Sequence, residues 1–411
     1  MQIKEIAKQT KSVLRDFYHI HKNGIYLHSI NSKKSKDIIN VVFICQPPSL
    51  WNSIRTVYQE ACRNPLFKTF LIAIPEKDFD NDGIHFTYGK NNSYTYLKDN
   101  GFDVIEGYKN GNFIDIKSLK PDYVFLPRPY DQHLPDEYKS NALVKYTRVC
   151  YVPYGFSLTN DCMPTIFNYS FLKNTYLFFP DSFCAKNYVN ALYKKKLCKW
   201  NKIGNIGFPR FDLLNQQLIK KRCKSFLWTP RWTTQKESCG STFFLFIDKL
   251  LDFFIEHEDL ELIFRPHPLL FRNFLATGEL SQEKYDSILK AFDEHKNLIL
   301  NDPVEDYIKI FNDVDAMITD PTSLLPEFFY TGKPIIYCDT SEAFNEAGLV
   351  MAKGLYYASN WEQIMENINK LASGEDALLK ERSESLHKLN SSKNIGKQIC
   401  DFLISDLFQT K

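Results

Sequence analysis

Short apolar runs that end in polar or proline residues recur along the chain and predict buried strands. These runs cover 38–44, 69–74, 122–126, 224–228, 262–264, 315–319 and 335–338. Helix-like segments lie between them, for example at 53–62 and 93–100. Strands that alternate with helices at this spacing form parallel sheets, and continuous apolar runs suit strands that are covered on both faces. The pattern predicts an α/β protein.

The length of the chain predicts more than one domain. A chain of 411 residues is too long for one core and fits two domains of about 150–200 residues each. Changes in pattern divide it into a basic amphipathic helix and tether at 1–36, an N-terminal α/β domain at 37–215, a C-terminal α/β domain at 216–376 and terminal helices at 377–411.

The N-terminal segment has two open interpretations. Its apolar residues fall roughly on one helical face, and they are Ile3, Ile6, Ala7, Val13, Leu14 and Phe17. Such a helix either packs on the N-terminal domain or lies on an anionic membrane surface, where basic amphipathic helices bind.

Composition excludes several function classes. The net charge of +2 gives no general case for nucleic-acid binding, and the lack of a G-x-G-x-x-G sequence counts against a dinucleotide cofactor. The 10 cysteines show no C-x-x-C pair, which argues for a reducing compartment and against disulfides or a structural zinc site. Because no apolar stretch approaches 18 residues, we expect no transmembrane helix and a cytoplasmic protein.

Polar residues follow the apolar run at 315–319 and predict an anion site. Asp320, Thr322 and Ser323 lie between this strand and a following helix, whose expected cap is Thr322 or Asp320. The N–H groups of a first helical turn and the helix dipole attract phosphate. The alternative is an ordinary strand-to-helix turn with a hydroxyl cap.

Two more strand ends carry phosphate-compatible groups. Arg265 and His267 alternate with prolines after 262–264, and on an extended backbone residues two apart project to the same side. Thr229, Arg231 and Trp232 follow the strand at 224–228. Because ligands of open α/β sheets bind outside the carboxyl ends of the strands, we expect the three loops to converge on one phosphate site.

Four sequence blocks together resemble the CDP-glycerol glycerophosphotransferase family. They are WTPRW at 228–232, RPHP at 265–268, ITDPTSLLPEF at 318–328 and TGKPIIY at 331–337, with GFPRFD at 207–212 as a weaker match. The family builds teichoic-acid-like and capsular polymers. The resemblance implies the glycosyltransferase-B architecture, which consists of two Rossmann-like parallel-sheet domains that face a cleft. It also implies that the terminal helices at 377–411 cross back onto the N-terminal domain.

The resemblance also implies roles for the residues of the C-terminal domain. It assigns His267, Arg265, Thr322 and Ser323 to the donor's phosphates and places Glu327 near the ribose. We add Thr229, Arg231, Trp232 and Asp320 to the donor-binding residues on the basis of the three loops. The carboxylates Asp315, Asp320 and Glu327 are too scattered for a dedicated Mg²⁺ site, so we expect no protein-bound metal and treat Mg²⁺ as optional.

One departure concerns the expected base in the N-terminal domain. The family usually has a His-Gly pair at a strand end, whereas this chain has Tyr154 and Gly155. A tyrosine has a reference pKa near 10, too high for a ready base at neutral pH. Asp131 or His133, in the acceptor-side segment that begins with Arg128, is the candidate replacement. Tyr154, at the position of that histidine, stays a catalytic candidate, and the alternatives are an acceptor contact or strand packing.

The leading hypothesis is transfer of a phosphoglycerol-like unit. The acceptor, a cell-surface polysaccharide or a lipid-linked chain, attacks the distal phosphorus of a CDP-activated donor through a hydroxyl, and CMP leaves. Positioning and charge stabilisation by Arg265, His267 and Arg231 would drive this step. The alternatives are a nucleotide-sugar glycosyltransferase of the same fold and a non-catalytic nucleotide- or polymer-binding subunit. Lipid-linked acceptors favour a peripheral position on the inner face of the membrane.

Overall fold

The computed structural model describes two compact units. It covers residues 2–31, 37–80, 85–218, 221–235, 240–302, 306–338, 343–389 and 393–408, with side chains from residue 14 onward. The first unit comprises Met1–Ser157, Asp161–Leu213 and Ser392–Lys411. The second comprises Leu158–Asn160 and Leu214–Ser391.

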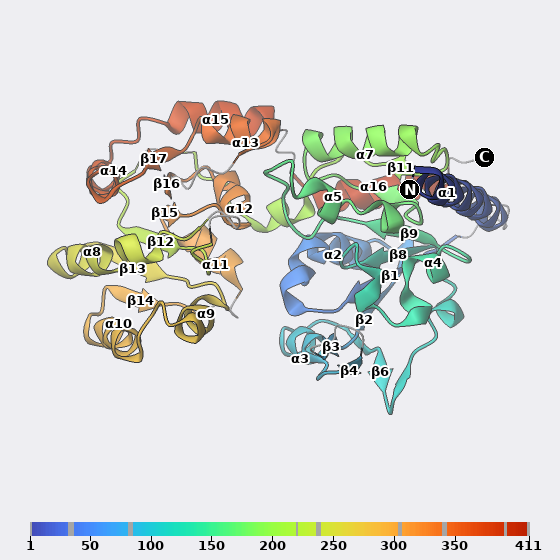
Figure 1. The fold of residues 1–411 in the computed structure, drawn as a ribbon, viewed down its shortest axis with the longest axis horizontal. Coiled ribbons are helices and arrows are strands. Elements are labelled where there is room, and N and C mark those ends of the chain that lie inside the picture. Colours follow the sequence, from blue (N-terminus) through green and yellow to red (C-terminus); the bar gives the residue numbers. More distant parts are fainter. Residues whose placement is uncertain are drawn as a thin grey trace. The chain divides into compact units, whose positions relative to one another are not determined.

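A parallel sheet forms the centre of the first unit (Figure 1). In the described ranges it has seven strands in the order β11-β10-β9-β8-β1-β2-β5. They are β1 (Ile39–Cys45), β2 (Phe67–Ala73), β5 (Ile105–Glu106), β8 (Tyr123–Leu126), β9 (Arg148–Tyr151), β10 (Leu177–Phe178) and β11 (Lys202–Ile203). Two antiparallel pairs accompany the sheet, β3 (Lys77–Phe79) with β4 (Phe86–Tyr88) and β6 (Tyr108–Lys109) with β7 (Asn112–Phe113).

Helices cover this sheet and bury its central strands. They are α1 (Gln2–Asn31), α2 (Arg55–Arg63), α3 (Asn92–Asp99), α4 (Ser140–Leu143), α5 (Met163–Ile166), α6 (Tyr169–Leu172), α7 (Phe183–Lys195) and α16 (Ile395–Phe408). All residues of β8 and β9 are buried, as the continuous apolar runs predict for strands with helices on both faces.

The second unit repeats this architecture with its own core (Figure 1). In the part of the chain described, its parallel sheet has six strands in the order β14-β13-β12-β15-β16-β17. They are β12 (Ser225–Thr229), β13 (Glu261–Phe264), β14 (Leu298–Leu300), β15 (Ala316–Thr319), β16 (Ile335–Cys338) and β17 (Tyr356–Ala358). Its helices are α8 (Phe243–Glu256), α9 (Leu270–Thr277), α10 (Gln282–Glu294), α11 (Tyr307–Asp313), α12 (Leu325–Tyr330), α13 (Glu346–Ala352), α14 (Trp361–Ser373) and α15 (Leu379–Lys388).

The expected fold class, α/β with two Rossmann-like parallel sheets, is confirmed. The return of the chain to the first unit begins at Ser392, later than the 377 that we expected. Helix α15 stays with the second unit because Arg382, which is fully buried, donates to Asp376 and, at 3.1 Å, to the Gly332 carbonyl. Helix α16 joins the first unit, where Asp212 accepts from the Ile395 and Gly396 N–H groups at its start.

Helix α1 packs on the first unit through a different face from the one predicted. Ile20, Leu27 and Ile30 are buried, and Asn23 donates to Asn174 at 2.9 Å. Leu14 and Phe17, which belong to the expected apolar face, are 65% and 57% exposed. Ile3, Ile6, Ala7 and Val13 lie outside the described side chains, and the tether at 32–36 lies outside the described residues.

Candidate functional site

The three strand-end loops of the second unit converge as predicted. Strand β12 pairs with β13 on one side and with β15 on the other, with Trp228 opposite Phe264 and Thr229 opposite Thr319. Because the three strands are parallel neighbours, the segments that follow Thr229, Phe264 and Thr319 leave the same edge of the sheet. This edge is the candidate donor site.

Asp320 holds two of these loops together rather than facing a ligand. Its side chain is fully buried and accepts from the N–H groups of Arg231 at 2.8 Å and Thr242 at 3.1 Å, and from the Thr242 hydroxyl. Burial raises the pKa of this carboxyl. A buried carboxylate whose oxygens are occupied by protein donors has no face for a donor phosphate, so Asp320 positions Arg231.

Arg231 and the threonines around it line the centre of the edge. The half-buried Arg231 side chain donates to the carbonyl of Pro321. The Thr229 and Thr319 hydroxyls are 2.7 Å apart and both buried, and the Thr319 hydroxyl lies 3.4 Å from that of Thr322. The hydroxyls of Thr229, Thr319 and Thr322 therefore lie in a row from the sheet into the loop. In this loop Thr322 is half-buried and Ser323 is exposed.

The helix start expected at Asp320 or Thr322 is wrong. Helix α12 begins at Leu325, after Leu324, with no side-chain cap. Pro326 in its first turn suits a helix start because proline lacks an N–H group that would otherwise be unpaired, and it fixes the start downstream of the hydroxyls. Thr322 and Ser323 thus lie in a turn before a short helix, where they offer hydroxyl and N–H donors.

His267 presents a neutral N–H donor. Its Nδ1 accepts from the Leu269 N–H at 3.1 Å, so the proton of the neutral ring sits on Nε2. Part of the side chain is exposed, yet the burial of its inner part, together with the nearby charge of Arg231, lowers its pKa. The ring of Trp232 lies beside it, with centroids 5.9 Å apart.

Arg265 turns away from His267, contrary to the expectation that both project to one side. Its guanidinium donates to the Asn301 side chain and the Asp302 carbonyl after β14 and lies 5.8 Å from the ring centroid of Tyr307. His267 instead lies beside Trp232, after β12. The two side chains do not project to one side because the backbone is no longer extended at His267. The chain there already turns into α9, and the Leu270 N–H donates to the His267 carbonyl.

Glu327 is linked to Arg265 through Tyr307. Glu327 is 1% exposed and accepts from the Tyr307 hydroxyl, and the Tyr307 ring in turn lies near the guanidinium of Arg265. The sequence-predicted residues therefore form two groups, Arg231 with His267 and Trp232, and Arg265 with Glu327. Tyr307 and Asn301, which connect the second group, gave no signal in the sequence because their partners are distant along the chain.

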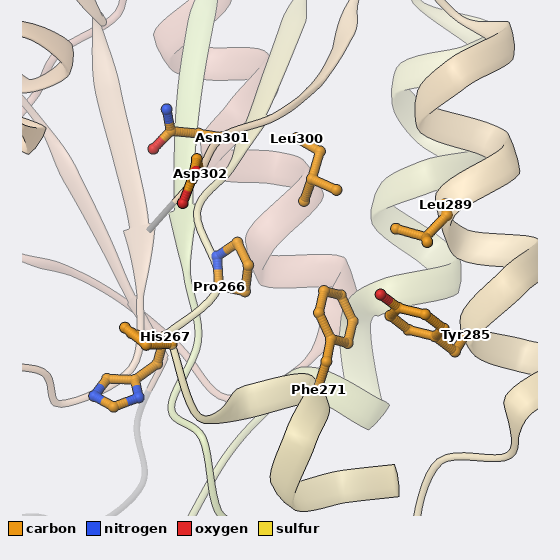
Figure 2. A pocket seen from close by; sticks show the side chains of 9 residues that line it. Pro266, His267, Phe271, Tyr285, Leu289, Leu300, Asn301 and Asp302 are labelled. Atoms are coloured by element: carbon orange, nitrogen blue, oxygen red, sulfur yellow. The ribbon is translucent and has the colours of Figure 1, made fainter. Parts of the chain in front are cut away.

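A pocket of about 320 Å³ opens next to His267. Figure 2 shows apolar and aromatic side chains on one side of the pocket, namely Phe271, Tyr285, Leu289 and Leu300, and Asn301 and Asp302 on another side. The imidazole of His267 is directed away from the aromatic rings. A largely apolar pocket with a few polar groups at its rim is the usual form of a small-molecule site.

The residues that we expected on the acceptor side, in the first unit, also follow neighbouring strand ends. Arg128, after β8, donates to Gln46 Oε1 at 2.7 Å, after β1, and to Glu76 at 2.8 Å, after β2. The Tyr130 and Tyr154 hydroxyls are 3.0 Å apart. Sequence reasoning missed Gln46, although its position before Pro47 and Pro48 at a strand end repeats the arrangement seen at 265–268. No neighbour lies within 4 Å of a Cβ built on Gly155.

The base candidates differ in their surroundings. Asp131 accepts from the N–H group and hydroxyl of Ser140, and burial raises its pKa. Burial and the hydrogen bond to Tyr130 raise the pKa of Tyr154 well above its usual value. Burial and the charge of Arg128 lower the pKa of His133. His133 is therefore deprotonated at pH 7 and can accept a proton, whereas Tyr154 stays protonated.

The carboxylates named as metal candidates do not fit a Mg²⁺ site. Asp315 pairs with Lys221 at 2.6 Å and accepts from the Lys224 N–H, while Asp320 and Glu327 are buried and bonded to protein donors. Within the described ranges no three His, Cys, Asp or Glu side chains gather closely enough to hold a metal ion. In the same ranges, no helix is long and apolar enough to cross a membrane.

Solved structures with the same fold include enzymes of nucleotide-sugar metabolism and a polymerase. A putative UDP-N-acetylglucosamine 2-epimerase from Listeria monocytogenes has a TM-score of 0.58 at 12% identity, covering 91% of this chain and 98% of its own. The UDP-GlcNAc 2-epimerase of Neisseria meningitidis, bound to UDP-GlcNAc, has a TM-score of 0.57 at 13% identity, covering 91% and 100%. The wall teichoic acid polymerase TagF, soaked with CDPG, has a TM-score of 0.53 at 13% identity, covering 100% and 99%. Identities this low show the fold alone.

The family follows from the sequence comparison. No curated protein matches the chain. Residues 159–391, more than half of the chain, match the family described as CDP-Glycerol:Poly(glycerophosphate) glycerophosphotransferase. The match includes the loops that carry Arg231, His267 and Thr322. The chain belongs to the CDP-glycerol:poly(glycerophosphate) glycerophosphotransferase family.

Proposed function

We propose that the second unit binds CDP-glycerol at the carboxyl edge of its sheet and that a hydroxyl of the acceptor polymer attacks the distal phosphorus. A new phosphodiester bond forms, the bond between that phosphorus and the bridging oxygen breaks, and CMP leaves with the electron pair. The observation that carries this proposal is the convergence of Arg231, His267 and Thr322 at one edge of the sheet. No observation in the structure favours the sugar-transferase alternative.

The donor's diphosphate would be held by a cation and neutral donors. Arg231 supplies a permanent positive charge, His267 Nε2 supplies an N–H group, and Thr322 and Ser323 supply hydroxyl donors. These donors would stabilise charge that develops on the phosphate oxygens as CMP leaves. Any Mg²⁺ used in the reaction would arrive on the donor's diphosphate, because the candidate carboxylates are occupied by protein donors.

The pocket beside His267 would take the cytosine base. Phe271 and Tyr285 offer aromatic surface, and the Asp302 carboxylate is an acceptor that suits the exocyclic amino group of cytosine, which uracil lacks. We expect Asp302→Asn to reduce the preference for CMP over UMP in calorimetric titrations. An unchanged preference would place the base elsewhere.

In the first unit, His133 would be the general base. Asp131 is engaged by Ser140 and Tyr154 is held protonated, whereas a histidine with a lowered pKa is ready to accept a proton at pH 7. Arg128 and the hydroxyl pair of Tyr130 and Tyr154 would position the acceptor chain.

Calorimetric titration with CDP-glycerol, CDP, CMP and UDP tests the donor assignment. We expect selective binding of the CDP compounds, loss of that binding in His267→Ala, and wild-type binding in His387→Ala, which alters an exposed histidine of α15. Equal binding of UDP, or an unaffected His267→Ala, would reject the assignment.

Helix α1 would bring the enzyme to the inner face of a membrane. One face of the helix, opposite the packed face, carries Leu14, Tyr18 and Ile25, which are 65%, 58% and 56% exposed. The Lys22 ammonium lies beside the ring of Tyr18. An exposed apolar stripe with adjacent cations suits an anionic bilayer surface. Cosedimentation with anionic vesicles should decrease in Leu14→Glu and Ile25→Glu, and equal sedimentation of both variants and wild type would contradict this placement.

A further inference from the structure

A second cavity lies in the first unit. It has a volume of about 580 Å³ and lies beside α7 and the edge strand β11. Six of its lining residues define what we call the lysine groove: Lys186, Asn190, Lys194, Leu197, Lys199 and Asn205. No carboxylate lines the cavity.

The groove presents polar groups at a regular spacing. Lys186, Asn190 and Lys194 are four residues apart on α7 and therefore lie on one face of the helix. At a rise of 1.5 Å per residue, successive members are about 6 Å apart along the axis. Lys199, after the end of the helix, and Asn205, after β11, complete the lining. A row of this kind suits a linear ligand better than a single small anion.

The positive charge of the groove is not neutralised within the described chain. Neighbouring lysines outside it are paired, Lys196 with Asp16 and Lys202 with Asp406. In the part of the chain that the structure describes, the lysines of the groove make no such ion pair, and no acid lies in the lining. Unpaired cations in a concave surface concentrate a positive potential there, which attracts polyanions.

A residue just beyond the end of α7 has a strained, left-handed backbone and an exposed apolar side chain. Leu197 has φ +58° and is 56% exposed, and the Cys198 N–H bonds back to the Tyr193 carbonyl at 2.9 Å. Glycine is the usual residue at this left-handed position, because a side chain strains the backbone there. Leucine here places an apolar side chain at the wall of the groove.

We propose that the lysine groove binds acceptor chain that has already been made, an anionic polymer of phosphodiesters joined by short polyol links. The lysines would contact successive phosphates, the asparagine amides would bond to polyol hydroxyls, and Leu197 would contact the carbon backbone. This inference rests on the proposed function, because it identifies the acceptor as the poly(glycerophosphate) product. An enzyme that retains its product in this way adds several units in each encounter.

Binding of a labelled poly(glycerophosphate) oligomer tests the groove. We expect the combined variant Lys186→Gln, Lys194→Gln and Lys199→Gln to bind about tenfold more weakly or worse, with a shallower dependence on salt because fewer phosphates are neutralised. The matched control is Lys90→Gln, Lys109→Gln and Lys145→Gln, which changes the charge equally at exposed positions of the same unit. Leu197→Gly should weaken binding while leaving the protein at least as stable, because glycine relieves the left-handed backbone.

Two further measurements separate the possible outcomes. The groove variant should bind CDP-glycerol as wild type does but release shorter products. Equal affinity of the groove and control variants for the oligomer would overturn the inference. A groove variant that loses binding only to anionic vesicles would also overturn it, because the ligand would then be a lipid headgroup. Failure of wild type to bind CDP-glycerol would instead refute the proposed function.

Discussion

The hydrogen bond between the Leu269 N–H and His267 Nδ1 decides what His267 can do at the residue scale. Because Nδ1 is an acceptor in this bond and the pKa of the ring is lowered, the neutral imidazole carries its proton on Nε2. A ring in this state is a poor base and a good donor to a phosphate oxygen.

Substitutions at His267 distinguish its two nitrogens. Glutamine places its amide N–H near the position of Nε2, whereas asparagine reaches only the position of Nδ1. We expect His267→Ala and His267→Asn to lower kcat by about 100- to 1,000-fold, as for loss of one donor to a developing charge, and His267→Gln to lower it less. Steady-state kinetics with CDP-glycerol measure this order, and equal losses in Asn and Gln would contradict it.

The pH dependence of activity tests His133 as the base. A base must be deprotonated, so kcat/KM should be full at neutral pH and fall as the pH drops through the pKa of His133. Burial and Arg128 lower that pKa below its ordinary 6.5, so the acidic limb should lie below pH 6.5. Arg128→Gln removes a repelling charge and should move the limb to higher pH. A limb that stays in place in this variant would argue against His133.

Asp181 predicts a pH-dependent loss of stability. It is buried against Ser157 and Ser182, and burial raises its pKa from 3.8 to about 6. The folded state therefore disfavours the ionised form, and the contribution of Asp181 to stability is full below pH 4 and is lost as the pH rises through 6. The decrease is roughly 3 kcal/mol at 1.36 kcal/mol per pKa unit. In urea unfolding, Asp181→Asn should lack this decrease, and a parallel decrease in wild type and variant would disprove it.

At the scale of elements, the apolar runs predicted those features of the fold that local sequence determines. The strands, their parallel arrangement and the convergence of three loops follow from run length and from the rule for strand ends. Pro326 marks the start of α12 within the local sequence. The burial of Asp320 and the direction of Arg265 instead depend on partners that are distant in sequence, such as Thr242 and Asn301, and could not be predicted. Lys333, in the TGKPIIY block, is an example of a motif residue with a structural role, since it donates to the carbonyls of Phe311, Asn312 and Val314 at the end of α11.

Helix α16 is fixed at its far end by a buried carboxylate. Asp406 accepts from the hydroxyls of Tyr123 and Tyr176 at 2.7 and 2.9 Å and pairs with Lys202. Its side chain is 2% exposed. A buried donor left without its acceptor costs about 1–3 kcal/mol, and Asp406→Ala removes the acceptor of the Tyr123 and Tyr176 hydroxyls. We therefore expect this variant to lower the unfolding free energy of the first unit by about that amount.

Asp401 on the same helix is the matched control for this prediction. It pairs with Lys397, and both side chains are more than half exposed. Exposed pairs contribute about 0–1 kcal/mol, so Asp401→Ala should change stability little. Similar losses in the two variants, measured by urea unfolding, would show that Asp406 does not hold the helix.

On the scale of the whole molecule, the two units carry different parts of the argument. The family match begins at residue 159 and so includes every donor-side residue but not Arg128, His133 or Tyr154. The family, and with it the proposed donor residues, was therefore recognisable from sequence blocks. The residues proposed for the acceptor were identified only from contacts in the structure. Tyr154 stands where a histidine was expected, and the contacts of Gln46 and Glu76 with Arg128 form only in the folded unit.

The transfer reaction itself is the most direct test of the central claim. Purified protein is incubated with CDP-glycerol and a poly(glycerophosphate) acceptor, and CMP and new phosphodiester groups are quantified together, with His267→Ala as the control. We predict one phosphodiester for each CMP in wild type, and both products formed at least about 100-fold more slowly in the variant. Binding of CDP-glycerol without phosphodiester formation, or formation of a glycosidic bond from a nucleotide sugar, would contradict this account.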